Sequence, residues 1–506
     1  MSLMGLDIGT TGCKAIAFDL EGKVLAQAYR EYPLLHLQPG WSELDANNLW
    51  FSVTEILKEV NQQLQSNPVE ALSVSCQGEA VTAIDNKGEV LCNFSVSFDH
   101  RTIPQAQWWE QHWGPEKLFK ITGMPLHAMY SINKIMWYRE NEPEIYDNAV
   151  KFLCVEDFIN FKLTGEYAID RSLAGRTMAF DVVDKTWSDK VLKAADVDRA
   201  LLSQACPSGT AIGEILPNVA KELGFESNVV VATGGHDQPC GTLGSGITEP
   251  GIAMNATGTS DVICPAFSEP MLSEAMLSNN YSCYPHCVSG QYVSIAFNLT
   301  GGLLLRWYRD NFCDSEKLRA KKNNRNIYDV IIEEASEDIR SLFFLPHFVG
   351  AGTPYLDSQS RGALVGLTID TNKQHISRAV LDSTNYEMKL NIELMNEAGL
   401  GIRELRATGG GAKNKRWLQM KADTFNMPVV SMEVSEAASL GAAILAGMGL
   451  KTFANINEAV ESMVHVVTAY EPDKKQNHLY EHKYQQYKQL YPALKNYNKL
   501  LLLNLE

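Results

Sequence analysis

The hydropathy pattern at the start of the chain predicts short strands joined by tight turns. Apolar residues recur in three brief runs, residues 3–8, 14–19 and 24–29, with glycine and small polar residues between them. This spacing is typical of a β-meander. From Leu49 to Leu64 the apolar positions recur every three or four residues, so we expect an amphipathic helix there.

The second half of the chain repeats this pattern. Residues 252–256 and 261–264 are predicted strands on either side of Thr257-Gly-Thr-Ser260, which echoes Gly9-Thr-Thr-Gly12. Other predicted elements are helices at 303–312, 374–398 and 437–447 and a strand at 404–408 that runs into three glycines. Strands alternate with helices throughout, which indicates an α/β chain with mixed sheets.

One stretch in the middle of the chain places an acidic residue after a strand. The β-branched run 229–231 precedes Thr233-Gly-Gly-His-Asp-Gln238, and we expect Gly234 and Gly235 to end the strand. Asp237 would then lie just past the strand end, where ligands bind in open α/β sheets. An aspartate at this place can also simply cap a helix, so its partners decide its role.

Composition limits the possible functions. The chain has 506 residues, too many for one hydrophobic core, and we place a domain boundary near residues 244–246. A hydrophobic content of 45% and a charged content of 21% indicate a globular protein. The formal net charge of -16 argues against nucleic acid or an anionic membrane as the main partner.

The cysteines and the chain start predict a cytoplasmic protein. Ten cysteines are scattered, and the closest pair, Cys283 and Cys287, has no accompanying histidine cluster at metal-site spacing. Free buried thiols in a reducing compartment are the simpler interpretation. The first residues resemble no secretory signal, and no apolar run is long enough to span a bilayer.

Three glycine turns are candidate phosphate sites. They lie at residues 9–12, 257–260 and 409–411, where backbone N–H groups can face an anion. Any one of them alone would be an ordinary tight turn. Together they suggest a polyphosphate held between two domains, although the chain has neither a P-loop nor the dinucleotide-binding glycine motif.

Polar residues that follow strand ends in the first half are candidate sugar ligands. They are Gln77, Glu79, Asp99 and Arg101. Side chains of this kind can hydrogen-bond several hydroxyl groups and reject analogues that lack one. The alternative is that Glu79 and Arg101 form a surface ion pair.

Two motifs carry a resemblance to a known family. Gly362-Ala-Leu-Val-Gly-Leu367 is followed after a short gap by His375-Ile-Ser-Arg-Ala-Val-Leu-Asp382. Together they match the second signature of the FGGY carbohydrate kinases, which the chain resembles from Gly5 to about Gly449. The resemblance implies two actin-like, ribonuclease H-like domains, residues 1–245 and 246–506, with mixed sheets flanked by helices and an ATP cleft between them.

The same resemblance implies roles for individual residues. Asp237 matches the catalytic base, and Asp7 matches the Mg²⁺ position, acting through water. Arg306 differs from the residue expected in glycerol kinases. The residues that match the substrate site are Gln77, Glu79, Asp99, Arg101 and Gln238, and those that match the ATP site are Thr10, Thr11, Lys14, Gly258, Thr259, Gly302, Arg306, Gly410 and Asn414.

The order Gln77-Gly78-Glu79 differs from both branches of the family. Xylulose kinases typically carry Gln-Met-His-Gly here, and glycerol kinases have arginine between the glutamine and the glutamate. We expect Gly78 to leave room for a bulkier substrate. Neither xylulose nor glycerol is therefore assigned from these residues alone.

The resemblance predicts an ATP- and Mg²⁺-dependent kinase that phosphorylates a terminal hydroxyl of a small carbohydrate. The substrate would be a ketose such as a pentulose, or a related polyol or sugar acid. In such a reaction a carboxylate orients the hydroxyl and accepts its proton. The alternatives are an actin-like nucleotide-dependent switch and a sugar-binding regulator without catalysis. A homodimer is an expectation at the level of the family.

Overall fold

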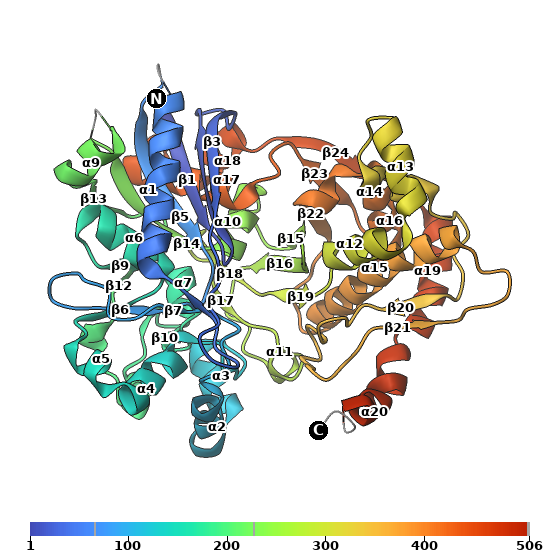
Figure 1. Cartoon of the computed structure of the whole chain (residues 1–506), viewed down its shortest axis with the longest axis horizontal. Coiled ribbons are helices and arrows are strands. Elements are labelled where there is room, and N and C mark those ends of the chain that lie inside the picture. Colours follow the sequence, from blue (N-terminus) through green and yellow to red (C-terminus); the bar gives the residue numbers. More distant parts are fainter. Residues whose placement is uncertain (65–66, 226–227, 503–506) are drawn as a thin grey trace.

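The computed structural model describes residues 1–64, 67–225 and 228–502, which form two lobes that each contain a central sheet (Figure 1). The first lobe is built on a six-stranded mixed sheet. Its strands, in spatial order, are β13 (Ala211–Glu214), β14 (Val230–His236), β5 (Val69–Cys76), β1 (Ser2–Ile8), β2 (Gly12–Phe18) and β3 (Val24–Glu31).

The opening meander of this sheet is confirmed. β1 pairs antiparallel with β2, and β2 with β3, while β5 and β14 run parallel to the meander's first strand. The predicted helix is α1 (Ala46–Gln63), and the carboxylate of Asp45 caps it by accepting from two backbone N–H groups. The buried face of α1 carries Leu49, Val53, Ile56, Leu57 and Val60, as the pattern predicted.

The second lobe is built on an eight-stranded mixed sheet. Its core is the hairpin of β15 and β16, beside which β22 runs parallel to β15. The strands are β17 (Tyr284–Pro285), β18 (Tyr292–Val293), β16 (Asp261–Phe267), β15 (Ile252–Thr257), β22 (Glu404–Thr408), β23 (Val429–Met432) and β24 (Val466–Tyr470), with β19 (Ala296–Asn298) also on β16.

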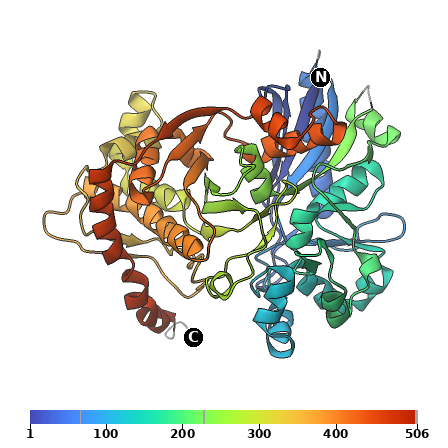
Figure 2. The ribbon, with the colours of Figure 1, turned by 180° about the vertical axis from the view of Figure 1, so that it is seen from behind.

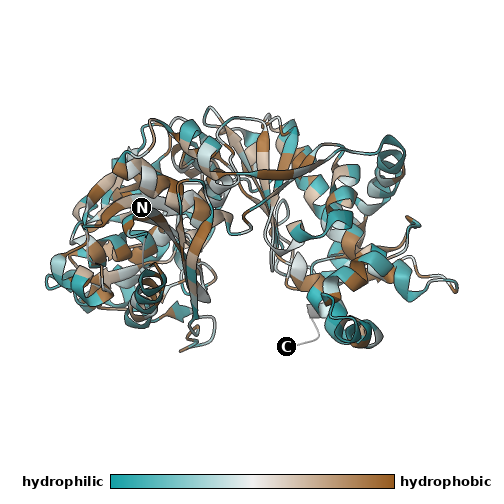
Figure 3. Ribbon diagram, turned by 90° about the horizontal axis from the view of Figure 1, so that it is seen from above, coloured by the Kyte–Doolittle hydropathy of each residue, from teal (hydrophilic) through white to brown (hydrophobic). Residues whose placement is uncertain are grey.

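Helices cover both sheets, and the apolar segments lie inside each lobe (Figure 3). Those used below are α4 (Ser131–Asn141), α7 (Arg171–Gly175), α10 (Asp237–Gly244), α12 (Gly302–Phe312), α15 (Lys373–Glu397), α16 (Lys415–Phe425), α17 (Ala437–Leu450), α18 (Ile456–Met463) and α19 (Lys474–Tyr487). Within residues 1–64, 67–225 and 228–502, no helix is both long enough and apolar enough to cross a membrane.

The predicted strand end at Gly234 and Gly235 is wrong, because β14 continues through both glycines to His236. A Cβ atom on Gly234 would lie 2.0 Å from the carbonyl oxygen of Val74, so only glycine lets β14 approach β5 this closely. The register between these strands shifts at the same place. The glycines therefore serve the pairing of two strands, and Asp237 begins α10 directly.

Helix α17 comes late in the chain but packs on the first lobe. It contacts β1, β5, β14 and α10, and both views show it and α18 in orange-red beside the blue strands (Figures 1 and 2). A Cβ on Gly5 would lie 1.8 Å from the carbonyl oxygen of Ser439, and one on Gly244 would lie 1.9 Å from that of Ala437. Glycines thus allow backbones from distant segments to meet.

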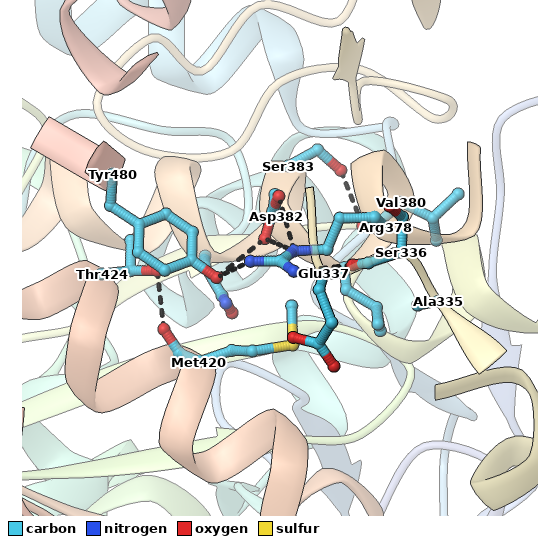
Figure 4. A network of polar contacts seen from close by, with 12 residues as sticks. Ala335, Ser336, Glu337, Arg378, Val380, Asp382, Ser383, Met420, Thr424 and Tyr480 are labelled. Atoms are coloured by element: carbon cyan, nitrogen blue, oxygen red, sulfur yellow. Dashed lines mark hydrogen bonds and ion pairs between the residues drawn. The ribbon is translucent and has the colours of Figure 1, made fainter. Parts of the chain in front are cut away.

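The charged residues of the motif at 375–382 have structural partners. Arg378 donates from Nε to both carboxylate oxygens of Asp382 at 3.0 Å and from Nη2 to the Tyr480 hydroxyl at 2.6 Å (Figure 4). Its Nη1 donates to the backbone carbonyl of Ser336 at 2.8 Å. The three side chains are buried, so this part of the motif ties α15 to α19.

Candidate active site

Asp237 lies at the start of α10 with a partly exposed side chain. Its Oδ1 is buried without a hydrogen bond among the described residues, although the side chain as a whole is 34% exposed. The imidazole Nε2 of His236 lies 3.1 Å away but lacks hydrogen-bond alignment. Burial raises the pKa of Asp237 to about 7, helped by the negative charges of Asp7 and Glu79. A carboxylate with this pKa suits a general base near neutral pH.

Glu79 is held in a strained conformation by a neighbouring helix. Its φ angle of 65° lies in the left-handed region, which is unfavourable for a residue with a side chain. Two side chains of α4 donate to its carbonyl oxygen, Ser131 at 3.1 Å and Lys134 at 2.7 Å. This conformation directs the carboxylate to Arg176, whose Nε donates to it at 2.6 Å.

Arg176 is a site residue that sequence reasoning missed. Its guanidinium lies between two aromatic rings, 5.5 Å from the ring centre of Tyr130 and 5.2 Å from that of Tyr284. It also holds the pKa of His236 down, second to the effect of burial, so that this imidazole is neutral. An isolated arginine 97 residues from Glu79 in sequence gives no local signal of this pairing.

The expectation that Gly78 leaves free space is wrong. A Cβ at this position would lie 3.0 Å from both Cδ2 and Nε2 of His236 and 3.6 Å from Cγ of Arg176. The imidazole ring therefore fills the volume beside the glycine. Gly78 allows His236 to pack against the strand end next to Asp237.

Asp99 and Arg101 lie in a buried ion cluster. Arg101 donates to both carboxylate oxygens of Asp99, at 2.9 and 2.7 Å, and to the carboxylate of Glu43. Its guanidinium also lies 3.7 Å from the ring centre of Trp41. The alternative surface ion pair between Glu79 and Arg101 is therefore wrong, because each is buried with a different partner. Contact of Asp99 or Arg101 with a sugar stays a prediction.

The amides of Gln77 and Gln238 differ in their contacts. The Gln77 oxygen accepts from the Thr10 hydroxyl at 2.9 Å, which joins the β1–β2 turn to the end of β5. Thr11, at the tip of the same turn, is exposed. Gln238 follows Asp237, and its Oε1 is buried without a hydrogen bond among the described residues. The Oε1 of Gln238 is therefore a second acceptor of this kind, in the residue that follows Asp237.

Asp7 lies at the end of β1. Its Oδ1 accepts from the Ser75 hydroxyl at 3.0 Å, and burial raises the pKa of Asp7 to about 6. Lys14, its partner across the β1–β2 pair, donates to Glu436 at 2.5 Å, just before α17 begins. Across residues 1–64, 67–225 and 228–502, no three acidic, histidine or cysteine side chains form a ready metal cage.

The predicted second-half ligands line one cavity of about 480 Å³, which we call the glycine cavity. A Cβ on Gly258 would contact nothing within 4 Å, so the backbone of this turn is open. The Gly302 N–H donates to the carbonyl oxygen of Gly258 at 2.8 Å, which fixes the start of α12. The predicted residues in the lining are Gly258, Thr259, Gly302, Arg306, Gly410 and Asn414.

Further residues of the glycine cavity had no clear sequence signal. One of them is Asp329, whose carboxylate accepts at 2.8 Å from the side-chain amide of Asn414, the residue that caps α16. Tyr328 and Trp417 add aromatic surface to the same lining. Apolar and aromatic lining beside a glycine turn that borders open space suits a ligand with a planar ring and a chain of phosphates.

Family models and known proteins show which family the chain belongs to. The model of the N-terminal domain of the FGGY family of carbohydrate kinases matches residues 2–244, and that of the C-terminal domain matches residues 253–450. The chain is 28% identical to a xylulose kinase of Bacillus subtilis over 501 residues, covering 99% of this chain and 98% of the relative. It is 30% identical to a glycerol kinase of Halorhodospira halophila, covering 88% of each.

Solved structures show the same fold over almost the whole chain. A gluconate kinase from Lactobacillus acidophilus superimposes with a TM-score of 0.88 at 25% identity, covering 97% of this chain and 98% of that one. A ligand-bound xylulose kinase from the same organism gives a TM-score of 0.89 at 25% identity, covering 98% of both chains. The actin-like arrangement expected from the resemblance is therefore confirmed.

Proposed function

This chain belongs to the FGGY family of carbohydrate kinases, and from that premise we propose that Asp237 is the general base that activates a terminal hydroxyl of its sugar. Residues 1–245 would carry the sugar site and the first phosphate turn. Residues 246–506 would carry the nucleotide site. The reaction moves the terminal phosphoryl group of ATP to the hydroxyl oxygen.

The observation that carries this proposal is the Oδ1 of Asp237, which has no hydrogen-bond partner in the described part of the chain. A buried carboxylate oxygen without a donor is unfavourable, and a sugar hydroxyl supplies the missing donor. As the oxygen–phosphorus bond forms, the hydroxyl proton passes to Asp237, whose pKa of about 7 makes it a better base than an ordinary aspartate. The transition state is loose, so orientation of the hydroxyl contributes more than deprotonation in advance.

The glycine cavity fits ATP. The turn at Gly258 borders open space, while Trp417 and Tyr328 line the rest. Arg306 would contact the phosphates, and Asn414 the adenosine. Lys14 would approach the phosphates from the first lobe once it leaves Glu436.

The surroundings of Asp7 fit Mg²⁺ held mainly by phosphate and water. One carboxylate near phosphates, without a full protein cage, is the usual arrangement for this ion. Burial raises the pKa of Asp7 by more than the Ser75 hydroxyl and the charge of Lys14 lower it, so a cation beside this carboxylate would be favourable. When bound, the ion neutralises charge on the phosphates.

The proposed substrate is a pentulose, with a related polyol or sugar acid as the alternative. Relatives along almost the whole chain are named xylulose kinase. Gln77, Glu79, Arg176 and Gln238 would supply donors and acceptors for the sugar hydroxyl groups. Because Glu79 and Arg176 neutralise each other, a neutral sugar suits the site better than a sugar acid.

The test uses purified Asp237→Asn, which keeps the shape of the side chain. It should bind an ATP analogue as the wild type does and lose turnover with every sugar. Wild-type phosphorylation is measured on pentuloses, hexuloses, polyols and aldonates. Sugar phosphorylation at the wild-type rate by Asp237→Asn would show that the base is elsewhere.

A further inference from the structure

A second cavity, of about 360 Å³, lies apart from the residues of the candidate active site. We call it the Arg171 cavity. Its volume is in the range of small-ligand pockets. Its walls come from the start of α7, the loop at residues 207–209, the β17–β18 loop and the segment that joins α17 to α18. Both lobes therefore contribute to it.

The lining of the Arg171 cavity carries two cations in a protein that is acidic overall. Arg171 and Lys185 are in its lining, which contains no aspartate or glutamate, whereas the whole chain has a formal net charge of -16. Within the described part of the chain neither cation has a hydrogen bond or an ion pair; Lys185 only lies 5.2 Å from the ring centre of Tyr292. The Nε of Arg171 is buried without a partner. Two cations without acceptors favour an anion between them.

The same cavity has two buried acceptors that lack donors. His286 is 4% exposed, and its Nε2 lies 3.3 Å from the carbonyl oxygen of Ile247, while Nδ1 has no partner among the described residues. Burial lowers the pKa of His286 to about 4, so its ring is neutral. Gln291 donates to the carbonyl of Thr248, and its buried Oε1 is likewise without a donor. Native structures leave few such atoms without a partner.

We propose that the Arg171 cavity binds a small anion that also carries hydroxyl groups. The anionic group would lie at Arg171 and Lys185, and the hydroxyl groups would donate to His286 and Gln291. A sugar phosphate and a sugar acid share this chemistry. Simple inorganic anions match only the cationic part of the cavity.

The Arg171 cavity lies against β14, the strand that directly precedes Asp237. Cys287, in its wall, has its Sγ 3.8 Å from the Sγ of Cys240 in α10. A Cβ on Gly235 would lie 2.7 Å from the same Cys287 Sγ, so the wall packs directly on the end of β14. Since Leu445 and Met448 of α17 complete the wall, a ligand here would change turnover through elements that hold Asp237.

Calorimetric titrations test this site with an ATP analogue kept at saturation, so that phosphate cannot enter the glycine cavity. The probes are inorganic phosphate, a pentulose phosphate and gluconate. The variants are Arg171→Gln and Lys185→Gln, and Arg325→Gln is the control because it makes the same charge change on an exposed arginine paired with Glu333. Thermal unfolding shows whether each variant is folded. If Arg171→Gln is not folded, Lys185→Gln replaces it in the binding test.

Wild type should bind a polyhydroxylated anion, and Arg171→Gln should weaken that binding about tenfold or more. The Arg325→Gln control should bind as the wild type does. His286→Gln should weaken the same ligand about threefold to tenfold and leave inorganic phosphate unchanged. Preference for the pentulose phosphate or for gluconate identifies the anionic group.

Kinase turnover supplies a second readout. The bound anion should change the turnover of wild type, whereas Arg171→Gln should keep basal turnover and lose this response. The proposal would be overturned if Arg171→Gln and Lys185→Gln both bound the probes as the wild type does. It would also be overturned if the wild type bound none of the probes. Equal affinity for inorganic phosphate and for both hydroxylated probes would overturn the role of His286 and Gln291.

Discussion

The raised pKa of Asp237 predicts a steep pH dependence of catalysis. If this residue must be ionised to accept the hydroxyl proton, kcat/KM should rise with pH as Asp237 loses its own proton. With a pKa of about 7, roughly a tenth of the molecules carry the ionised form at pH 6 and roughly nine tenths at pH 8. We therefore expect kcat/KM to rise roughly tenfold between these values. An ordinary aspartate, with a pKa near 3.9, would be fully ionised across this range.

The variant Glu79→Gln tests the cause of the shift. The negative charge of Glu79 helps raise the pKa of Asp237, and its removal also leaves Arg176 without its partner. Both changes favour the ionised form of Asp237, so the rise in kcat/KM should move to lower pH. Glu89→Gln is the control, because Glu89 is exposed and is not among the groups that shift the pKa of Asp237.

The assay measures initial rates at low sugar and saturating ATP from pH 5.5 to 8.5. Stability is checked after incubation at each pH, so that unfolding is not mistaken for protonation. A flat profile in the wild type would refute the assignment of a raised pKa to the catalytic base. An unchanged profile in Glu79→Gln would refute the electrostatic contribution of that carboxylate.

Three further predictions concern other parts of the site. Arg101→Met should lower the free energy of unfolding by about 3–5 kcal/mol in urea titrations, because it leaves two buried carboxylates without their cation; a wild-type midpoint would contradict this. Gly78→Ala should push His236 toward Asp237 and lower kcat with little change in the KM for ATP; steady-state kinetics would contradict it if kcat were unchanged. Arg306→Ala should raise the KM for ATP about fivefold and leave that for the sugar unchanged; a change confined to the sugar would contradict it.

Hydropathy and turn residues predicted several elements in each lobe because they are local signals. The meander, α1, α15 and β22 all follow from apolar periodicity and glycine punctuation. The strand end at Gly234 was mispredicted because glycine locally favours a turn, whereas here the neighbouring strand needs the missing side chain. A local preference was overridden by a contact 160 residues away in sequence, between Gly234 and the carbonyl of Val74.

Side-chain pairing in the candidate site could not be predicted in the same way. Lys14 and Glu436 are separated by 422 residues, and Glu79 and Arg176 by 97. Their meeting depends on how whole sheets and helices pack, which no local pattern specifies. The residue types and the ends of strands indicated a polar site around Asp237, but the partner of each charge required the three-dimensional arrangement.

The late position of α17 has a consequence for biosynthesis. The first sheet is fully translated once the ribosome passes His236, yet the helix that covers one of its faces ends only at Leu450. At ordinary translation speeds the ribosome reaches Leu450 roughly 10–40 s after it passes His236. During that interval the nascent polypeptide carries an uncovered apolar surface, which favours aggregation. The first lobe is therefore completed only after most of the second has been synthesised.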